Sequence, residues 1–272
     1  RKPYIVTVHD IGPLTRPEFF SKRAIKWMKL GFDHMVEHAA AIICVSQATA
    51  EEVTSVAGDS IREKLHVIHE GVEPMFFGEP DLESLSSLRE LPENGTPFCL
   101  AAGAISPRKN VLRIVEAMEM IKDDLPHHLC MVGGSGWDAQ EVFQRFKNSP
   151  IADRIHHLGY VSDAQLHALY AKADVFVYPS LFEGFGLPVL EAMASGCPVV
   201  TSNVSSLPEV AGDGAVFVNP QDVHELAQAV RRVCQDSELA LSLRGRGKER
   251  AGEFTWRACS ERVAQVYEKV SG

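Results

Sequence analysis

The stretch DVFVYPSLFEGFGLPVLEAMASG, residues 174–196, decides the fold class of this chain. Its first part, DVFVYPS, is a short and continuously apolar run, which predicts a buried β-strand. Its second part, LPVLEAMASG, predicts a helix with Pro188 in the first turn and Gly196 as its C-terminal stop. A buried strand followed directly by a helix is the repeating unit of a parallel sheet that helices cover on both faces.

The same alternation of strand and helix continues along the chain. We predict strands near residues 4–8, 40–45, 65–69, 98–104, 129–133, 155–158, 174–178, 198–201 and 215–218. We predict helices near residues 19–38, 48–57, 110–122, 138–147, 163–172, 188–195, 222–235, 238–250 and 256–270. The fold class is therefore α/β, with doubly wound parallel sheets.

The predicted strands divide unevenly around a stretch rich in glycine and proline. Three of them precede it and six follow it. We therefore expect residues 98–252 to form a complete domain, and residues 1–75 to form part of a first domain that is incomplete in this chain. Residues 76–97 are interpreted as a linker and residues 253–272 as a terminal helix. Because the chain opens on Arg1 and enters a strand almost at once, we expect it to be a fragment.

Composition argues against several classes of function. A formal net charge of −9 disfavours a general nucleic-acid or anionic-membrane binder, although local basic patches are compatible with it. The six cysteines form no metal-like pair, and we interpret them as buried, reduced thiols of a cytoplasmic protein. We recognise no signal peptide and no membrane-spanning run in the sequence.

The loop between the strand and the helix of the opening stretch carries two acids and two glycines. Gly184 and Gly186 let the backbone approach a ligand and take up positive φ. The loop lies at the carboxyl end of a parallel strand, where open α/β sheets bind ligands. This predicts a nucleotide diphosphate at the helix start, with Glu183 on one side and Glu191 on the other. The amides available to such an anion belong to Phe185, Gly186 and Leu187.

Two other interpretations of the paired acids stay open on loop chemistry alone. Glu183 is equally well explained as a solvated loop acid, and Glu191 as an acid on the helix surface. A hydrolase pair fits less well, because Glu191 faces an anion-binding helix end and would be an awkward nucleophile.

Residues 179–215, PSLFEGFGLPVLEAMASGCPVVTSNVSSLPEVAGDGA, closely resemble the retaining glycosyltransferases of family 4, which have the two-domain GT-B fold. The signature of that family is two glutamates separated by seven residues, the spacing of Glu183 and Glu191. GAISPRKNV (103–111) resembles the family's diphosphate-binding loop, and VTVHD (6–10) resembles its amino-domain histidine strand. FTWRACSERVAQVYEKV (254–270) resembles the closing helix that crosses back to the first domain. The resemblance implies that 1–75 is part of an acceptor domain and 98–252 the nucleotide-sugar donor domain.

The resemblance also implies roles for individual side chains. Lys109, together with Arg108, would hold the departing diphosphate and stabilise its growing negative charge. His9 would lie against the donor sugar and stabilise the positive ring of the transition state. Glu183 would hold hexose hydroxyls, and Glu191 the ribose hydroxyls. Without the resemblance, the basic pair is equally interpretable as solvated cations, and His9 as a satisfied histidine at a strand end.

Other positions are assigned to the base or to structural tasks. The nucleotide base is expected beside the backbone of Tyr160 and Val161. Asp10 is expected to orient the imidazole of His9 or to cap the following turn. Helix caps are expected at Asn110, at Ser162 or Asp163, and in a capping box formed by Ser206 and Glu209.

The function implied is the retaining transfer of a hexose from a nucleotide sugar to an acceptor hydroxyl in glycan assembly. It needs no metal and no cofactor, because cations and helix amides already cover the diphosphate. The wording HDIGPL and SPRKN resembles mannosyltransferases of lipopolysaccharide and capsule assembly, so GDP-mannose is the first donor. UDP-glucose and UDP-N-acetylglucosamine stay open as donors. The partners are then the nucleotide sugar and a glycan or lipid-linked acceptor, with no nucleic acid.

Two rival classes of function are retained. A nucleotide-sugar epimerase can share this fold, but it would lack the paired glutamates. A non-catalytic nucleotide-binding module is the other, since the first domain is expected to be incomplete. On either the main interpretation or this last one, the fragment would bind nucleotide and transfer little sugar.

The helix predicted over residues 19–38 has a basic and partly aromatic composition. Such a helix could rest on an anionic membrane at its inner face, where a lipid-linked acceptor is held. The alternative is an amphipathic helix that covers the first sheet. The residues concerned are the cations Lys22, Arg23, Lys26 and Lys29 and the apolar Phe19, Phe20, Trp27 and Met28.

Overall fold

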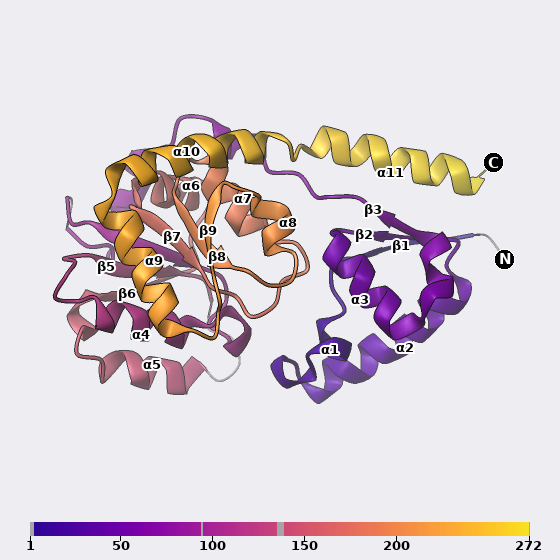
Figure 1. The fold of residues 1–272 in the computed structure, drawn as a ribbon, viewed down its shortest axis with the longest axis horizontal. Coiled ribbons are helices and arrows are strands. Elements are labelled where there is room, and N and C mark those ends of the chain that lie inside the picture. Colours follow the sequence, from indigo (N-terminus) through magenta and orange to yellow (C-terminus); the bar gives the residue numbers. More distant parts are fainter. Residues whose placement is uncertain (1–2, 94, 135–138, 272) are drawn as a thin grey trace.

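A computed structural model describes residues 3–93, 95–134 and 139–271 of the chain. It contains two parallel sheets, as Figure 1 shows. The first has the order β1-β2-β3, formed by Ile5–Val8, Ala41–Cys44 and Leu65–Val67. The second has the order β6-β5-β4-β7-β8-β9. Its strands are β4 (Phe98–Ala102), β5 (His128–Val132), β6 (Ile155–Gly159), β7 (Val175–Tyr178), β8 (Val199–Ser202) and β9 (Ala215–Val218). All nine predicted strands form, and the α/β fold class is confirmed.

The longer helices follow the predicted order. They are α2 (Lys22–His38), α3 (Gln47–Ala57), α4 (Val111–Met120), α5 (Ala139–Lys147), α6 (Asp163–Lys172), α7 (Leu187–Ala194), α9 (Val223–Gln235), α10 (Ser237–Gly252) and α11 (Trp256–Ser271). The prediction missed two short helices, α1 (Gly12–Thr15) and α8 (Leu207–Ala211), because four or five residues do not complete a recognisable helical period. Residue 138, the predicted start of one helix, lies outside the described residues.

The prediction that one helix runs through 19–38 is wrong at its beginning. Residues Pro17–Phe19 form a separate 3₁₀ turn, and α2 starts after Ser21. The hydroxyl of Ser21 accepts a hydrogen bond from the N–H of Ala24 at 3.2 Å, which makes Ser21 the N-cap. The cap ends the preceding turn and sets the direction of α2.

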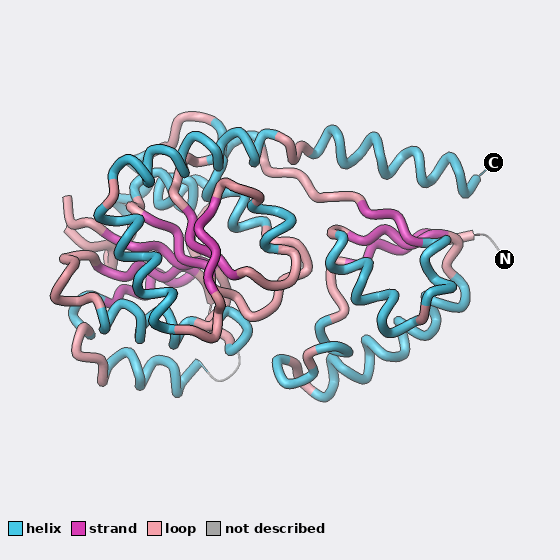
Figure 2. Tube along the Cα trace, viewed as in Figure 1, coloured by secondary structure: helices cyan, strands magenta, loops and turns pink. Residues whose placement is uncertain are grey.

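The six-stranded sheet is buried on both faces. Along β7, Val175 and Val177 belong to one core cluster, whereas Phe176 and Tyr178 belong to the other. Helices α4, α5 and α9 supply the first cluster, and α6 and α7 supply the second. Figure 2 shows helices on either side of these strands. Successive side chains of a strand point to opposite faces, so a run without polar residues is what two covered faces require.

The order of the second sheet reverses between β4 and β7. From β4 the chain proceeds outward to β5 and β6, and it then returns to β7 on the other side of β4. The loops that follow β4 and β7 therefore leave in opposite directions at the carboxyl end of the sheet. Such a switch point forms the crevice in which open α/β sheets bind ligands.

Helix α11 and the segment after β3 connect the two sheets. Thr255 forms an isolated parallel bridge with Val72, and Val266 of α11 is buried against Ile43 of β2. Figure 1 shows α11 running beside the first sheet. In the stretch interpreted as a linker, two 3₁₀ helices form at Pro74–Phe77 and Leu82–Ser87, and Phe76 is buried in the core of the second sheet.

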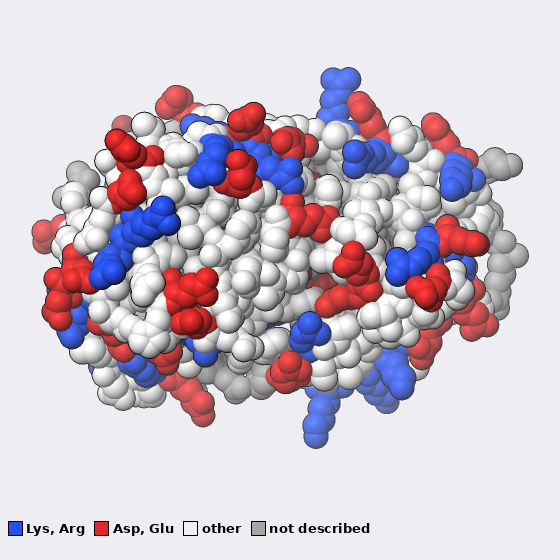
Figure 3. Space-filling model, in the orientation of Figure 1, with Lys and Arg blue, Asp and Glu red and all other residues white. Residues whose placement is uncertain are grey.

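The surface carries charged side chains of both signs. Figure 3 shows acidic and basic groups interspersed over the face in view. Within the described residues, no helix combines the length and the apolar character that crossing a membrane would require.

Candidate active site

Glu183, Arg108 and Lys109 meet in the crevice between the β4 and β7 loops. The carboxylate of Glu183 accepts hydrogen bonds from Nη1 of Arg108 and Nζ of Lys109, both at 2.6 Å. It also accepts a hydrogen bond from the hydroxyl of Tyr178 at 2.9 Å. Glu183 is only 8% exposed. Burial alone would raise the pKa of Glu183, but Lys109 and Arg108 outweigh burial and hold this pKa below its usual value of 4.5.

Tyr178 is a member of this cluster that the sequence analysis did not identify. It is the last residue of β7, and its hydroxyl also contacts the ammonium group of Lys109. The same ammonium lies 4.5 Å from the centre of the Tyr178 ring. Its place at the carboxyl end of the strand, five residues before Glu183, is the signal that could have identified it.

Asn110 fixes the loop that carries the basic pair. The prediction that it caps α4 is wrong, because its side chain makes no capping hydrogen bond. Asn110 instead has φ 58°, a left-handed conformation that asparagine tolerates. Its Nδ2 donates to the carbonyl groups of Pro179 and Pro220, at 3.0 Å and 2.7 Å. Asn110 thereby ties the β4 loop to the loops that follow β7 and β9.

The start of α7 has the geometry that its glycine and proline predict. Gly186 has φ 116°, Pro188 lies in the first turn, and Gly196 follows the helix with φ 72°. Among the described residues, no acceptor is hydrogen-bonded to the first amides of this helix start. These amides, which belong to Phe185, Gly186 and Leu187, form the anion site expected at a helix N-terminus.

Gly184 serves a different purpose from the predicted one. It is not among the residues with positive φ. A Cβ atom at this position would lie 1.9 Å from the carbonyl oxygen of His9. The glycine is therefore required because the β7 loop presses against the backbone that follows β1. Its own carbonyl accepts hydrogen bonds from Ser46 at 2.6 Å and Thr49 at 3.1 Å, at the start of α3.

The two serines after β8 support the same loop. The hydroxyl of Ser206 donates to the carbonyl groups of Glu183 and Phe185, at 3.0 Å and 2.6 Å. Ser205 has φ 52°, and its hydroxyl accepts a hydrogen bond from the N–H of Glu183 at 3.1 Å. The predicted capping box of Ser206 and Glu209 is therefore wrong, because Ser206 makes no capping bond to α8.

Glu209 reaches across to the first sheet instead. Its carboxylate accepts hydrogen bonds from the N–H groups of Gln47 and Ala48, at 2.8 Å and 3.2 Å. It also lies 2.6 Å from Nε2 of His69. Burial alone would raise the pKa of Glu209, but His69 and the two amides together hold this pKa below its usual value. No local pattern announces these partners, since they are more than a hundred residues away in the chain.

His9 lies immediately after β1, as predicted, with its backbone against Gly184. Its side chain is 68% exposed, and its Nδ1 lies 3.1 Å from Oε1 of Glu70. Of the two roles predicted for Asp10, the structure supports the second. Its carboxylate accepts a hydrogen bond from the N–H of Gly12 at 2.8 Å and so caps the following turn.

Glu191 lies on the other side of the α7 loop. It accepts a hydrogen bond from the hydroxyl of Tyr170 at 3.3 Å. Burial, reinforced by Asp163 and Glu73, raises the pKa of Glu191 to about 7. Asp163 opens α6 directly after the segment predicted to bind the base.

In that segment, Tyr160 is 87% exposed and Val161 is buried. Gly159 before them has φ 70°, which turns the chain at the end of β6. The predicted cap at Ser162 is confirmed. Ser162 and Gln165 form a complete capping box at the start of α6.

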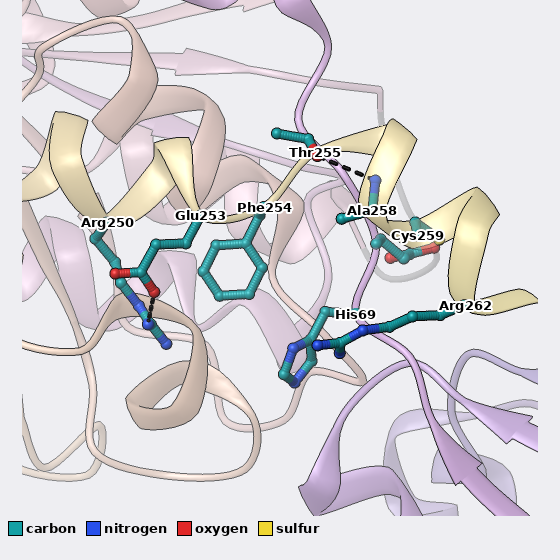
Figure 4. A pocket seen from close by; sticks show the side chains of 9 residues that line it. His69, Arg250, Glu253, Phe254, Thr255, Ala258, Cys259 and Arg262 are labelled. Atoms are coloured by element: carbon teal, nitrogen blue, oxygen red, sulfur yellow. Dashed lines mark hydrogen bonds and ion pairs between the residues drawn. The ribbon is translucent and has the colours of Figure 1, made fainter.

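A cavity of about 350 Å³ lies where the α10–α11 junction faces the segment after β3. Figure 4 shows Phe254 beside His69, and Arg262 extending from α11 towards His69. The cavity also contains Glu70, the partner of His9, but no residue of the α7 loop. In residues 3–93, 95–134 and 139–271, no group of three or more His, Cys, Asp and Glu side chains is arranged to hold a metal ion.

Known proteins of similar sequence point to one family. Residues 87–250 match the family model described as Glycosyl transferases group 1, and residues 1–76 match the model described as Glycosyltransferase Family 4. The chain is 31% identical over 269 residues to the O-antigen chain mannosyltransferase B of Escherichia coli, covering 97% of this chain and 69% of that protein. It is 29% identical over 263 residues to the serotype-specific mannosyltransferase WbdA of Escherichia coli, covering 93% of this chain and 32% of that protein.

A solved structure shares the fold. Anabaena HepE in complex with UDP and glucose superposes with a TM-score of 0.83 at 22% identity, covering 98% of this chain and 71% of that chain. The chain therefore spans between about a third and about seven tenths of the proteins to which it is similar. Since the group 1 model alone matches more than half of the chain, the family resemblance predicted from the paired glutamates is confirmed. The chain belongs to the group 1 glycosyltransferases of family 4, which have the GT-B fold.

Proposed function

We propose that this protein transfers a hexose, with mannose as the first choice, from a nucleotide sugar to an acceptor hydroxyl with retention of configuration. The observation that carries the proposal is the convergence of Lys109 and Arg108 on Glu183 beside the start of α7. Two cations and a helix N-terminus at one switch point suit a diphosphate leaving group. The similarity to mannosyltransferases supports mannose, and UDP-sugars remain the second choice of donor.

The diphosphate would lie over the α7 amides and take hydrogen bonds from Arg108 and Lys109. Such contacts strengthen as negative charge develops on the leaving group, and they need no metal ion and no cofactor. An ionised carboxylate accepts about four hydrogen bonds. Glu183 already accepts three, so a further position is left for a hydroxyl of the hexose.

The remaining donor contacts lie on both sides of the loop. Glu191 would accept the ribose hydroxyls, and the base would lie beside the backbone of Tyr160 and Val161. His9, whose side chain is largely exposed, would lie against the donor sugar. Its pairing with Glu70 orients the imidazole and favours the positive charge that stabilises a nearby leaving group.

We propose the following division of labour within the chain. Residues 98–252 would form the donor domain, and residues 1–75 would contribute to the acceptor domain. Residues 76–97 would connect them, and residues 253–272 would cross back to the first part. The acceptor is a glycan or a lipid-linked glycan, and the protein would act in the cytoplasm, at the inner face of the membrane.

Helix α2 supports the membrane part of this proposal. Its buried face, with Phe32 and Met35, packs on the first sheet. The opposite face exposes Trp27 and Leu30, which are 63% and 54% exposed. Four exposed cations share that face, Lys22, Arg23, Lys26 and Lys29. Figure 3 shows basic side chains projecting at the lower edge of the molecule, where Figure 1 places α1 and α2. Cations beside exposed apolar side chains suit an anionic lipid surface.

The test compares donors and then chemistry. Thermal shift with GDP and UDP identifies the nucleotide, and donor turnover is followed with and without added acceptor hydroxyl compounds. The expected result is stabilisation by GDP, which Lys109→Ala removes. Sugar release from the donor with retained configuration supports a transferase, whereas an isomerised nucleotide sugar supports the epimerase class. Nucleotide binding without any turnover, by a protein that includes the rest of the first domain, would contradict the proposal.

A further inference from the structure

Four side chains that the proposed function does not use meet at the amino end of the six-stranded sheet. Cys99 lies in β4, and Cys234 lies near the end of α9. His127 directly precedes β5, and Asp174 directly precedes β7. The strands are parallel, so these positions lie at the edge opposite to the one that carries Lys109 and Glu183.

His127 and Asp174 form a buried pair within this cluster. Nε2 of His127 lies 3.4 Å from Oδ2 of Asp174, which also accepts a hydrogen bond from the N–H of Phe98 at 3.2 Å. His127 is only 8% exposed. Its Nδ1 is buried and has no hydrogen-bond partner among the described residues. A buried imidazole nitrogen without a partner, next to a thiol, needs an explanation.

The thiol of Cys234 supplies that explanation. It lies beside both His127 and the thiol of Cys99, and it packs against the core cluster that contains Cys99. Cys99 is fully buried, whereas Cys234 is partly exposed. One thiol is thus accessible to a small solute, and the second is held against it from inside.

The charges of the cluster favour an ionised Cys234. Contact with Cys99, followed by the effect of His127, lowers the pKa of Cys234 to about 6 against the opposing effect of burial. Burial alone would lower the pKa of His127, but Asp174 and Cys234 raise it to about 9. Near neutral pH the two groups are therefore a thiolate and an imidazolium.

The other cysteines lack this environment. Burial raises the pKa of Cys44, Cys130 and Cys197 to about 12. Cys259 on α11 is partly exposed, as Cys234 is, but burial raises its pKa. Cys259 is therefore a matched comparison, since accessibility alone would make both thiols reactive.

We propose that Cys234 is a modification site, a nucleophilic thiol that reacts with hydroperoxides and is then resolved by Cys99 to an intramolecular disulfide. In the first step the Cys234 thiolate attacks one oxygen of the hydroperoxide and the O–O bond breaks. This forms a sulfenic acid, and the departing alkoxide takes the proton of the His127 imidazolium.

In the second step the sulfur of Cys99 attacks the sulfur of Cys234. The hydroxyl group leaves with the proton of Cys99 as water. The two thiols lose two electrons in total, and the hydroperoxide is reduced to an alcohol and water. The product ties α9 to β4 beneath the sheet. This proposal rests on the cluster alone and does not depend on the proposed function.

The experiment measures the rate of alkylation of each cysteine in the folded protein as a function of pH, by peptide mass spectrometry. Cys234 is expected to react several-fold faster than Cys259 at pH 7, because its larger thiolate fraction outweighs its lower intrinsic nucleophilicity. Its rate is expected to stay high down to about pH 6. His127→Asn is expected to shift this profile to higher pH, whereas Cys259→Ser is expected to leave it unchanged.

Hydrogen peroxide then tests the second step. We expect a Cys99–Cys234 cross-linked peptide that dithiothreitol reverses. Cys99→Ser should instead accumulate a sulfenic acid on Cys234 that dimedone traps, and circular dichroism of each variant checks folding. Equal reactivity of Cys234 and Cys259 across the pH range would overturn the proposal. So would a cross-link that appears only after the protein is unfolded.

Discussion

Nε2 of His69 and Oε1 of Glu209 lie 2.6 Å apart, which joins the segment after β3 to helix α8. The same carboxylate caps α3 through the amides of Gln47 and Ala48. A helix of the first sheet is therefore capped by a side chain from the second half of the chain. Because Glu209 follows the serines that hold the Glu183 loop, this contact couples the placement of α3 to the proposed donor site.

Replacement of Glu209 by Ala should loosen the two halves. The loss of a helix cap costs about 0.5–2 kcal/mol, and His69 loses its partner as well. We expect a lower Tm and a larger radius of gyration by small-angle X-ray scattering. The control is Glu51→Ala on the same helix, since the Glu51 carboxylate accepts a hydrogen bond from the side chain of Gln47 and lies on the surface. An unchanged radius of gyration in Glu209→Ala would show that other contacts hold the halves together.

Replacement of Glu183 by Gln should affect stability and turnover together. Two buried cations lose their counter-charge, which destabilises the fold by about 3 kcal/mol. We also expect turnover to fall by a larger factor than the donor KM rises, because the cations are positioned for the transition state. Glu119→Gln is the control, since it removes a similar partner from Arg145 far from the site. Lower donor affinity with normal turnover would contradict the role given to Glu183.

The acid stability of the same variant provides a second measurement. Glu183 has its folded pKa below 4.5, so its stabilisation is present above the unfolded pKa and is lost as the pH falls through the folded value. Urea unfolding between pH 3 and 6 should show this loss in the parent protein. The Glu183→Gln variant should be less stable at pH 6 and should vary less with pH. An identical slope in both proteins would show that Glu183 does not titrate with a lowered pKa.

Donor binding should strengthen as the pH rises through about 7. Ribose hydroxyls favour the ionised form of Glu191, but burial keeps this carboxyl protonated below about pH 7. Affinity should therefore fall by up to about tenfold for each pH unit below that value. Calorimetry with GDP-mannose in two buffers should detect proton release from Glu191 on binding. Glu191→Gln should remove both effects, and an unchanged pH profile in that variant would place the titrating group elsewhere.

Loss of the ribose contact should appear mainly in donor affinity. Hydrogen bonds to a charged acceptor contribute about 1.5–3 kcal/mol, so Glu191→Ala should weaken donor binding by roughly tenfold to a hundredfold. Turnover at saturating donor should fall much less, because the contact changes little between ground and transition states. Steady-state kinetics with GDP-mannose measure both quantities. Abolished turnover in Glu191→Ala would reverse the roles of the two glutamates.

Helix α2 should bind anionic vesicles through its exposed face. Each lysine near such a surface contributes about 1 kcal/mol, so Lys26→Ala combined with Lys29→Ala should weaken binding by about thirtyfold. Co-sedimentation with phosphatidylglycerol vesicles at low and high salt measures this. Lys122→Ala combined with Lys147→Ala is the control, since these lysines lie on the other half of the molecule. Equal binding by both double variants would contradict the proposed membrane face.

The strands and most helices could be predicted because their signals are local. The apolar run 174–178 forms β7, and the proline and glycine of 187–196 bound α7 as predicted. Short helices such as α8 were missed, since so few residues do not establish a period. The family followed from Glu183 and Glu191, whose spacing is a property of the sequence itself.

The sequence by itself determined the α/β class, the order of strands and helices, and the residues of the proposed donor site. Only the tertiary structure decided what those residues contact. Gly184 packs against His9 rather than turning with positive φ, and Glu209 caps α3 rather than its own helix. The physical reason is that a hydrogen-bond donor is satisfied by whichever acceptor the packed chain brings within reach. For Glu183 and Glu209 the partners come from positions far away in the chain, where no local pattern records them.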